Sequence, residues 1–198
     1  MMFKILFHGC EKIKDCIMSF VYKRQMKACG EKVRIHPSTS VYYGLENLTV
    51  GNNVSIPRYA HIFCTDAPLI IGNNVIFGPA PTIVTGNHRI DVIGEAIINV
   101  KDKLPENDSP VIIEDDVWVG ANVTILKGVT IGRGSVIAAG CVVNKSTLPY
   151  SISAGVPVRT IRLRFTIDEI MEHESRLYPE EERFSRSQLE SLYSNIEM

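Results

Sequence analysis

His88 stands at a point where a regular pattern in the sequence stops. A stretch of roughly twenty residues with little pattern follows it and ends near Pro110. A neutral imidazole near pH 7 can take a proton from a hydroxyl or an amine. Long loops inside compact repeats are usually functional or disordered, and a rigid scaffold gives a catalytic group its precision. We therefore interpret His88 as the candidate general base.

The other histidines are weaker candidates for this role. His8 and His173 fall in expected terminal helices, and His36 directly precedes a proline. His61 lies inside a repeat, which makes it the second candidate.

The elements that would position His88 are marked by a period of six residues. An aliphatic or aromatic residue recurs every six positions, with two slips of three residues and the one long excursion after Ile83. The recurring positions are Ile35, Val41, Val50, Ile56, Ile62, Ile71, Phe77, Ile83, Ile113, Val119, Ile125, Ile131, Ile137 and Val143. This period matches neither a helix nor a plain strand, and it predicts a parallel β-helix whose coils stack these side chains along one axis.

Small and polar residues occupy the expected corners of the coils. Glycine follows several axial residues, and Asn52-Asn53 and Asn73-Asn74 fall in the same corners. Gly and Asn suit backbone with positive φ, which we expect at these corners. Small or β-branched residues come fourth after the axial position, and we expect them to face inward as well: Val54, Ala60, Val75, Val117, Val123, Val129, Ser135 and Cys141.

Helices are expected at both ends of the repeat. Residues 11–28 form an amphipathic pattern with several lysines, and Gly30 would end that helix. We interpret it as a cap over the open end of the β-helix, with contact to a membrane surface as the alternative. Thr166 and Glu169 form a capping-box pattern before a second helix, and another amphipathic stretch lies near 187–193. The sequence thus divides into a cap (1–32), a β-helix (33–165, loop 89–110) and a helical tail (166–198).

Composition limits the functional classes. The chain has 198 residues, 45% of them hydrophobic, and a net charge of −1, without a basic patch that would indicate nucleic-acid binding. No apolar stretch approaches the roughly 20 residues of a membrane span. The five cysteines have no metal-ligand spacing and are interpreted as reduced thiols of a cytoplasmic protein.

Several segments together resemble the hexapeptide acyltransferases, left-handed β-helix enzymes that move acetyl from acetyl-CoA to a hydroxyl or amine. The segment from Gly86 to Asp91 is similar to the xenobiotic acetyltransferases in its Asn-His-Arg context. The segments 113–121, 140–145 and 154–157 resemble the maltose, galactoside and nodulation-factor acetyltransferases. The resemblance covers about residues 33–165 and implies an all-β fold with helical termini.

The resemblance implies a role for each matching position. His88 would deprotonate the acceptor hydroxyl, and the backbone N–H of Ala121 would stabilise the oxyanion on the thioester carbonyl. Trp118 would border the pantetheine arm, although an apolar contact between subunits explains it equally. The remaining CoA contacts would be Ala139, Asn144, Lys145 and Arg162. Related enzymes often have Thr where this chain has Asn144 and Asp where it has Ser146. The resemblance therefore supports a side-chain contact from Lys145 more strongly than one from Asn144.

The resemblance also implies a homotrimer without a metal, in which each site combines His88 of one chain with the CoA groove of the next. The acceptor would be a hydroxyl of a sugar or surface-polysaccharide precursor, with a streptogramin- or chloramphenicol-type xenobiotic as the alternative. A γ-carbonic-anhydrase-like metal protein and a non-enzymatic scaffold are the rivals from other classes. Candidate acceptor contacts are Asn87, Asp91, Tyr42 and Asp66.

Overall fold

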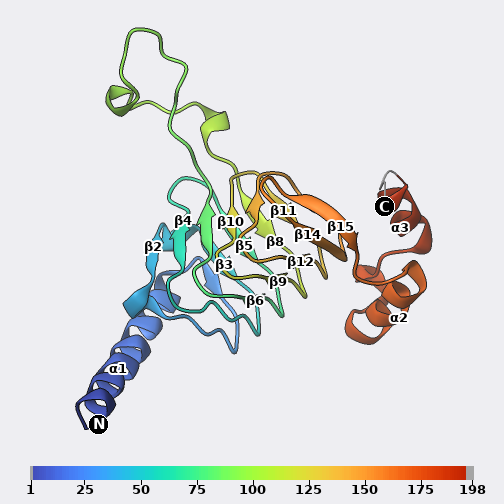
Figure 1. The fold of residues 1–198 in the computed structure, drawn as a ribbon, viewed down its shortest axis with the longest axis horizontal. Helices are drawn as coiled ribbons and strands as arrows, with labels where there is room; N and C mark the ends of the chain where they lie inside the picture. Colours follow the sequence, from blue (N-terminus) through green and yellow to red (C-terminus); the bar gives the residue numbers. More distant parts are fainter. Residues whose placement is uncertain (1, 195–198) are drawn as a thin grey trace.

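The computed structural model describes residues 2–194, and the side chains of the first helix from Glu11 onward. Its centre is a prism of three parallel sheets, with a helix at one end and two helices at the other (Figure 1). Each coil runs through sheet A, then sheet B, then sheet C. The sheets form a parallel β-helix, as the repeat predicts, and the β-helix is left-handed, as the family resemblance implies.

The strands are short and lie in three stacks. Sheet A contains β1 (Ala28–Cys29), β3 (Leu48–Val50), β5 (Leu69–Ile71), β8 (Val111–Ile113) and β11 (Thr130–Ile131). Sheet B contains β6 (Ile76–Phe77), β9 (Trp118–Val119), β12 (Val136–Ile137), β14 (Ser151–Ala154) and β15 (Arg159–Leu163). Sheet C contains β2 (Val41–Tyr43), β4 (His61–Phe63), β7 (Thr82–Val84), β10 (Thr124–Ile125) and β13 (Val142–Val143). Only the β14–β15 pair, which ends the prism, is antiparallel among the described strands.

The recurring residues stack on one another as the period predicts. Ile62, Ile83 and Ile125 pair in register through sheet C, and Ile71 pairs with Ile113 in sheet A. All five are buried. The small residues expected to face inward, from Val54 to Cys141, are buried too. The prediction for Val41 is wrong, because β2 aligns Tyr42 with Ile62 and turns Val41 outward.

The glycines after axial residues serve a different purpose from the one expected. None of Gly51, Gly78, Gly120 and Gly132 has positive φ. A Cβ on any of them would lie between 2.5 and 2.7 Å from backbone atoms of the next coil. These glycines therefore allow close approach between coils. Positive φ occurs at the corner residues Asn53 and Asn74, as their sequence predicts.

A ladder of side-chain oxygens joins the corners between sheets A and B. The Glu31 amide donates to Asn52 Oδ1 (2.8 Å), the Asn52 amide to Asn73 Oδ1 (2.9 Å), and the Asn73 amide to Asp115 Oδ1 (2.7 Å). Each corner thus satisfies the backbone of the coil before it, which fixes the register between coils.

The N-terminal helix α1 (Met2–Gln25) begins nine residues before the expected start and ends before Gly30. It contacts the first coil through polar groups. Asp15 accepts hydrogen bonds from the Ser38 amide (3.0 Å) and His36 (3.1 Å) and pairs with Arg58 at 3.2 Å. Ser19 donates to the carbonyl of Ile35 at 3.2 Å. The helix contacts the first coil through these polar groups and through Tyr22, which packs against the core. None of the described helices is long and apolar enough to cross a membrane.

The two C-terminal helices cover the other end. They are α2 (Ile167–Leu177) and α3 (Arg186–Tyr193), and Thr166 caps α2 with Glu169 in the expected capping box. Glu174 of α2 is buried and accepts hydrogen bonds from the Tyr150 hydroxyl (3.0 Å) and Arg133 (3.3 Å). Short 3₁₀ turns complete the chain: η1 (Pro37–Thr39), η2 (Leu45–Asn47), η3 (Ile97–Asn99), η4 (Pro105–Asn107) and η5 (Glu180–Glu182).

The inward stacking predicts unequal effects of two neighbouring isoleucines. Ile71 is 1% exposed and Ile70 is 39% exposed on the outer side of the same strand. We expect Ile71→Ala to lower the free energy of unfolding by about 2–5 kcal/mol, because it leaves a cavity in a packed axis. Ile70→Ala, the matched control, should cost less than about 1 kcal/mol. Equal losses in urea denaturation would contradict the assigned register.

The Asp15 contacts predict a pH-dependent contribution to stability. Burial alone would raise the pKa of Asp15, but hydrogen bonds from Ser38 and His36 and the charge of Arg58 outweigh burial and hold this pKa below its usual 3.8. The carboxylate therefore stabilises the fold above that value and loses its contribution as pH falls through the lowered pKa. We expect Asp15→Asn to lower the free energy of unfolding by about 1–3 kcal/mol at pH 7.

This difference should shrink in unfolding experiments below pH 3.8, where the parent carboxyl also takes up a proton. Asp168→Asn, at an 81% exposed carboxylate, is the control and should change little at either pH. A loss for Asp15→Asn that is the same at both pH values would contradict the assigned ionic contacts.

Candidate active site

The loop that carries His88 leaves the prism through a narrow neck. The Asn87 amide donates to the Asn107 carbonyl (2.8 Å), and the Ser109 amide donates to the Thr85 carbonyl (2.9 Å). Between them, Gly86 and Asp108 form an antiparallel bridge. The buried Thr85 hydroxyl is anchored on the Ala67 carbonyl at 3.0 Å. The neck thus extends the rigid part of the chain beyond the end of β7 at Val84.

His88 lies directly outside this neck, and its side chain is exposed. It is therefore four residues beyond β7, whereas the sequence placed it on the last strand before the loop. The closed neck fixes the backbone next to His88, while the imidazole ring is exposed to solvent. This combination suits a side chain that contacts a substrate.

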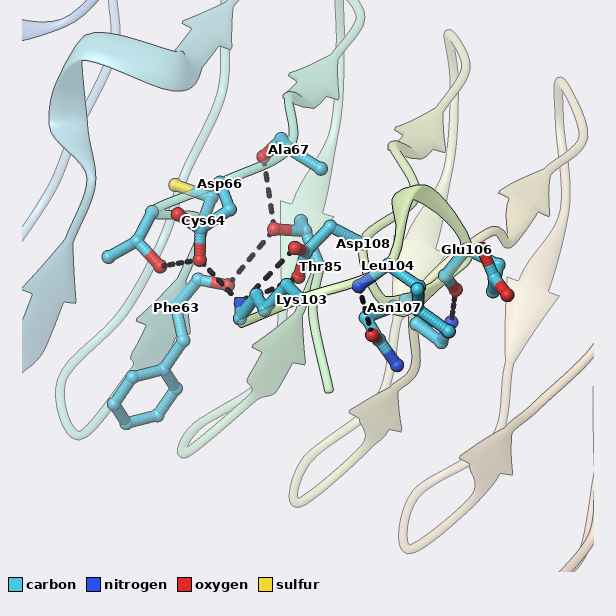
Figure 2. A network of polar contacts seen from close by, with 12 residues as sticks. Phe63, Cys64, Asp66, Ala67, Thr85, Lys103, Leu104, Glu106, Asn107 and Asp108 are labelled. Carbon is cyan, nitrogen blue, oxygen red and sulfur yellow. Dashed lines mark hydrogen bonds and ion pairs between the residues drawn. The ribbon is translucent and has the colours of Figure 1, made fainter. Parts of the chain in front are cut away.

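An ion-pair cluster ties the returning limb of the loop to the prism (Figure 2). Lys103 Nζ lies 2.6 Å from Asp66 Oδ2 and 3.0 Å from Asp108 Oδ1. The hydrogen bond to Asp66 raises the pKa of Lys103, and the same bond lowers the pKa of Asp66. Asp66, expected to contact the acceptor, is thus engaged with Lys103. No sequence pattern marks Lys103, because its two partners belong to different coils that the loop brings to it.

A second ion pair lies on the outgoing limb. Arg89 Nε donates to Asp91 Oδ1 at 2.8 Å, and Arg89 also pairs with Asp102 across the loop. The sequence left open whether Asp91 orients His88 or Arg89. The described contact is with Arg89, and this hydrogen bond lowers the pKa of Asp91.

The expected thioester contacts gather on sheet B and the corner after it. Trp118 is 54% exposed on the outer side of β9, beside Ile76 of β6. Val119 pairs with Ile137, so Ala121 and Ala139 occupy the same corner in successive coils. The amides of these two alanines donate to no described residue, while the Ala121 carbonyl accepts from the Gly140 amide at 2.8 Å. Two backbone donors are therefore free on this edge.

The remaining CoA candidates lie in two different places. Asn144 and Lys145 are exposed at the corner that follows β13, on the same edge of the prism as the loop. Arg162 lies on β15 and lines a pocket of about 480 Å³ between that strand and the terminal helices. Within one chain, sheet C separates His88 from Ala121, because the first follows sheet C and the second precedes it.

Tyr42, expected to contact the acceptor, faces the inside of the prism. Its ring packs against the core and meets Tyr22 of α1 edge-on at 5.8 Å. Burial of the hydroxyl strongly raises the pKa of Tyr42. Its exposed neighbour Tyr43, stacked on Phe63 at 5.7 Å, occupies the outer face.

No group of three His, Cys, Asp or Glu side chains in the described part of the chain is arranged to hold a metal ion.

Comparisons with known proteins identify the family. Residues 110–145 match the model of the bacterial transferase hexapeptide, six repeats. The chain is 35% identical over 146 residues to a putative acetyltransferase of Saccharomyces cerevisiae, which covers 73% of this chain and 69% of the relative. The chain belongs to the hexapeptide-repeat acetyltransferases.

Two further members of this family are informative. The galactoside O-acetyltransferase of Escherichia coli is 35% identical over 147 residues, 71% of this chain and 65% of the relative. A hexapeptide-repeat acetyltransferase of Vibrio cholerae, solved in complex with acetyl-CoA, superposes with a TM-score of 0.66 at 29% identity, covering 75% of this chain and 76% of the other. The chain spans less than two thirds of the length of the first three curated relatives it matches.

The ion-pair cluster predicts that Lys103 keeps the neck closed. Exposed ion pairs contribute up to about 1 kcal/mol, so Lys103→Gln should raise the hydrogen-exchange rates of the Asn87 and Ser109 amides about two- to fivefold. Lys101→Gln is the matched control, since Lys101 Nζ contacts the Ile98 carbonyl within the loop itself. Unchanged exchange in Lys103→Gln would show that the backbone bridge closes the neck unaided.

Proposed function

We propose that this chain is an acetyl-CoA-dependent O-acetyltransferase that acetylates a hydroxyl of a sugar or surface-polysaccharide precursor. The observation that carries the proposal is the exposed His88 directly outside the hydrogen-bonded neck of the loop, in a chain of this family. The acceptor class is supported by the relatives named galactoside O-acetyltransferases. The donor is supported by the acetyl-CoA complex of the V. cholerae protein.

The reaction follows from the chemistry of these groups. His88 takes the proton of the acceptor hydroxyl as that oxygen attacks the thioester carbonyl carbon. Negative charge develops on the carbonyl oxygen, and the free amide of Ala121 donates a hydrogen bond to it. The tetrahedral intermediate then collapses, the C–S bond breaks, and the imidazolium returns its proton to the CoA thiolate. The products are the acetyl ester and CoA.

The active site would be completed by a second copy of the chain in a homotrimer. His88 and Ala121 lie on opposite edges of sheet C, so a neighbour must bring one edge to the other. Large apolar side chains on the outer faces support such an interface, since Val41 and Tyr43 on sheet C and Ile76 and Trp118 on sheet B are exposed. Trp118 would then both pack between subunits and border the pantetheine arm.

The rest of the CoA groove would use the two prism edges. Ala139 would donate its free amide to the pantetheine, and Asn144 and Lys145 would face the nucleotide phosphates from the loop edge. Arg162 would add a cation from its pocket on β15. Lys and Arg suit phosphate oxygens, with Arg able to bind them bidentately.

The loop would select the acceptor. Asn87 and Asp91 flank His88 and are the proposed contacts, whereas Tyr42 and Asp66 are engaged elsewhere. The Asn87-His88-Arg89 context favours a xenobiotic acceptor as the second candidate. We place the protein in the cytoplasm, in keeping with the free state of the described Cys16, Cys29, Cys64 and Cys141.

The proposal predicts that His88→Ala lowers kcat about 10²- to 10⁴-fold, because general base catalysis contributes that much. The measurement is thiol release from acetyl-CoA with a panel of saccharides and of streptogramin and chloramphenicol acceptors. His61→Ala, at the other exposed histidine of the repeat, is the control and should retain activity. Full activity of His88→Ala would refute the assigned base, and release only with antibiotics would favour the xenobiotic acceptor.

A further inference from the structure

The outward face of α1 is apolar. Ile13, Ile17, Phe20 and Val21 are 62%, 62%, 60% and 43% exposed. Their spacing puts them on one side of the helix. In Figure 1 the helix extends away from the first coils at the end of the prism. A continuous stripe of large apolar side chains on a projecting helix indicates an interaction site, because exposing apolar surface to water is unfavourable.

The residues of this stripe are not part of the core of the prism. The opposite face of α1 makes the contacts with the prism, through Asp15, Ser19 and Lys23, whose Nζ donates to the Val33 carbonyl at 2.6 Å. Tyr22 packs against the core from that same face. The two faces of the helix therefore have separate tasks, and only the inner one has a described partner.

The charges on the helix are divided in the same way. Both acidic residues of the described part, Glu11 and Asp15, pair with Arg58 of the prism. Lys12, Lys14 and Arg24 stay exposed. The Arg24 guanidinium lies 4.5 Å from the centre of the Phe20 ring, so a cation sits within the apolar stripe itself. The outward side of the described helix is thus both apolar and positively charged.

We infer that α1 is a docking element for an anionic lipid surface. A helix with an apolar stripe and flanking lysine and arginine lies in the plane of a membrane, with its stripe at the boundary of headgroups and acyl chains. Anionic headgroups attract its cations. Pairing with α1 of a second copy would instead bring like cations together on the same stripe, which is unfavourable. The inference is independent of the acetyl transfer proposed above.

The test measures binding of the full chain to vesicles by co-sedimentation. We expect binding to vesicles of equal parts phosphatidylglycerol and phosphatidylcholine, and little binding to phosphatidylcholine alone. About 1 M NaCl should weaken it, because the Debye length falls to about 3 Å. The double variant Ile17→Ser, Phe20→Ser should bind at least about tenfold more weakly. Leu177→Ser, at a 54% exposed leucine on α2, is the matched control and should bind like the parent.

A second double variant tests the cations separately from the apolar stripe. Lys14→Gln with Arg24→Gln should remove the preference for phosphatidylglycerol without altering the helix content, which circular dichroism checks. Failure of the parent chain to bind the anionic vesicles would overturn the inference. Equal binding by the serine variant would also overturn it. If the parent does not bind vesicles and the serine variant has a smaller mass in light scattering, the stripe serves contacts between copies of the chain instead.

Discussion

The stacking of coils at a fixed register is the constraint on which the rest of the molecule depends. Each strand has only two to five residues, too few to be stable alone, and takes its hydrogen-bond partners from the coils before and after it. Axial side chains such as Ile83 and Ile125 then lie directly over one another. A coil cannot rotate or slide without burying a polar group or leaving a cavity. The corners share this rigidity, and the candidate functional groups other than Tyr42 lie at corners, on outer faces or in the loop.

The same constraint explains why the candidate site is divided. A prism presents its corners along parallel edges, and residues on different edges stay apart however the side chains move. His88 and Ala121 therefore keep their separation within one chain. In a trimer with threefold symmetry, the edge that carries His88 in one subunit would lie next to the edge that carries Ala121 in the neighbouring subunit. The first and last coils have unpaired strand edges, which could pair with other chains. Helices lie against both ends of the prism.

Much of this architecture could be predicted from the sequence, because repeat contacts join residues with the same place in the period. Ile71 or Ile137 could be placed without knowing the rest of the fold. Val41 was misplaced because the period breaks after it, and Tyr42 turns inward to meet Tyr22 of the capping helix. The amphipathic pattern of α1 was visible as well, but periodicity locates an apolar face without saying which side touches the protein. The inner side proved to combine polar contacts such as that of Asp15 with the packing of Tyr22 against the core.

The candidate site was predictable to a smaller extent. His88 could be singled out because a pattern ends beside it, and Ala121 and Ala139 fell in one corner because they share a place in the repeat. The Lys103 cluster could not be foreseen. Asp66 and Asp108 meet that lysine only because the loop returns past the corner it left. Contacts of this kind depend on the path of an irregular segment, which no period encodes.

The closed neck of the loop has an evolutionary consequence. Because the bridge between Gly86 and Asp108 and the ion pairs of Lys103 hold the two ends together, the other loop residues can be exchanged, added or removed with little effect on the prism. The entropic cost of a longer loop rises by only about 0.6 kcal/mol for each doubling of its length. A lineage carrying this fold could therefore replace this one segment while the inherited scaffold remained under no pressure to change.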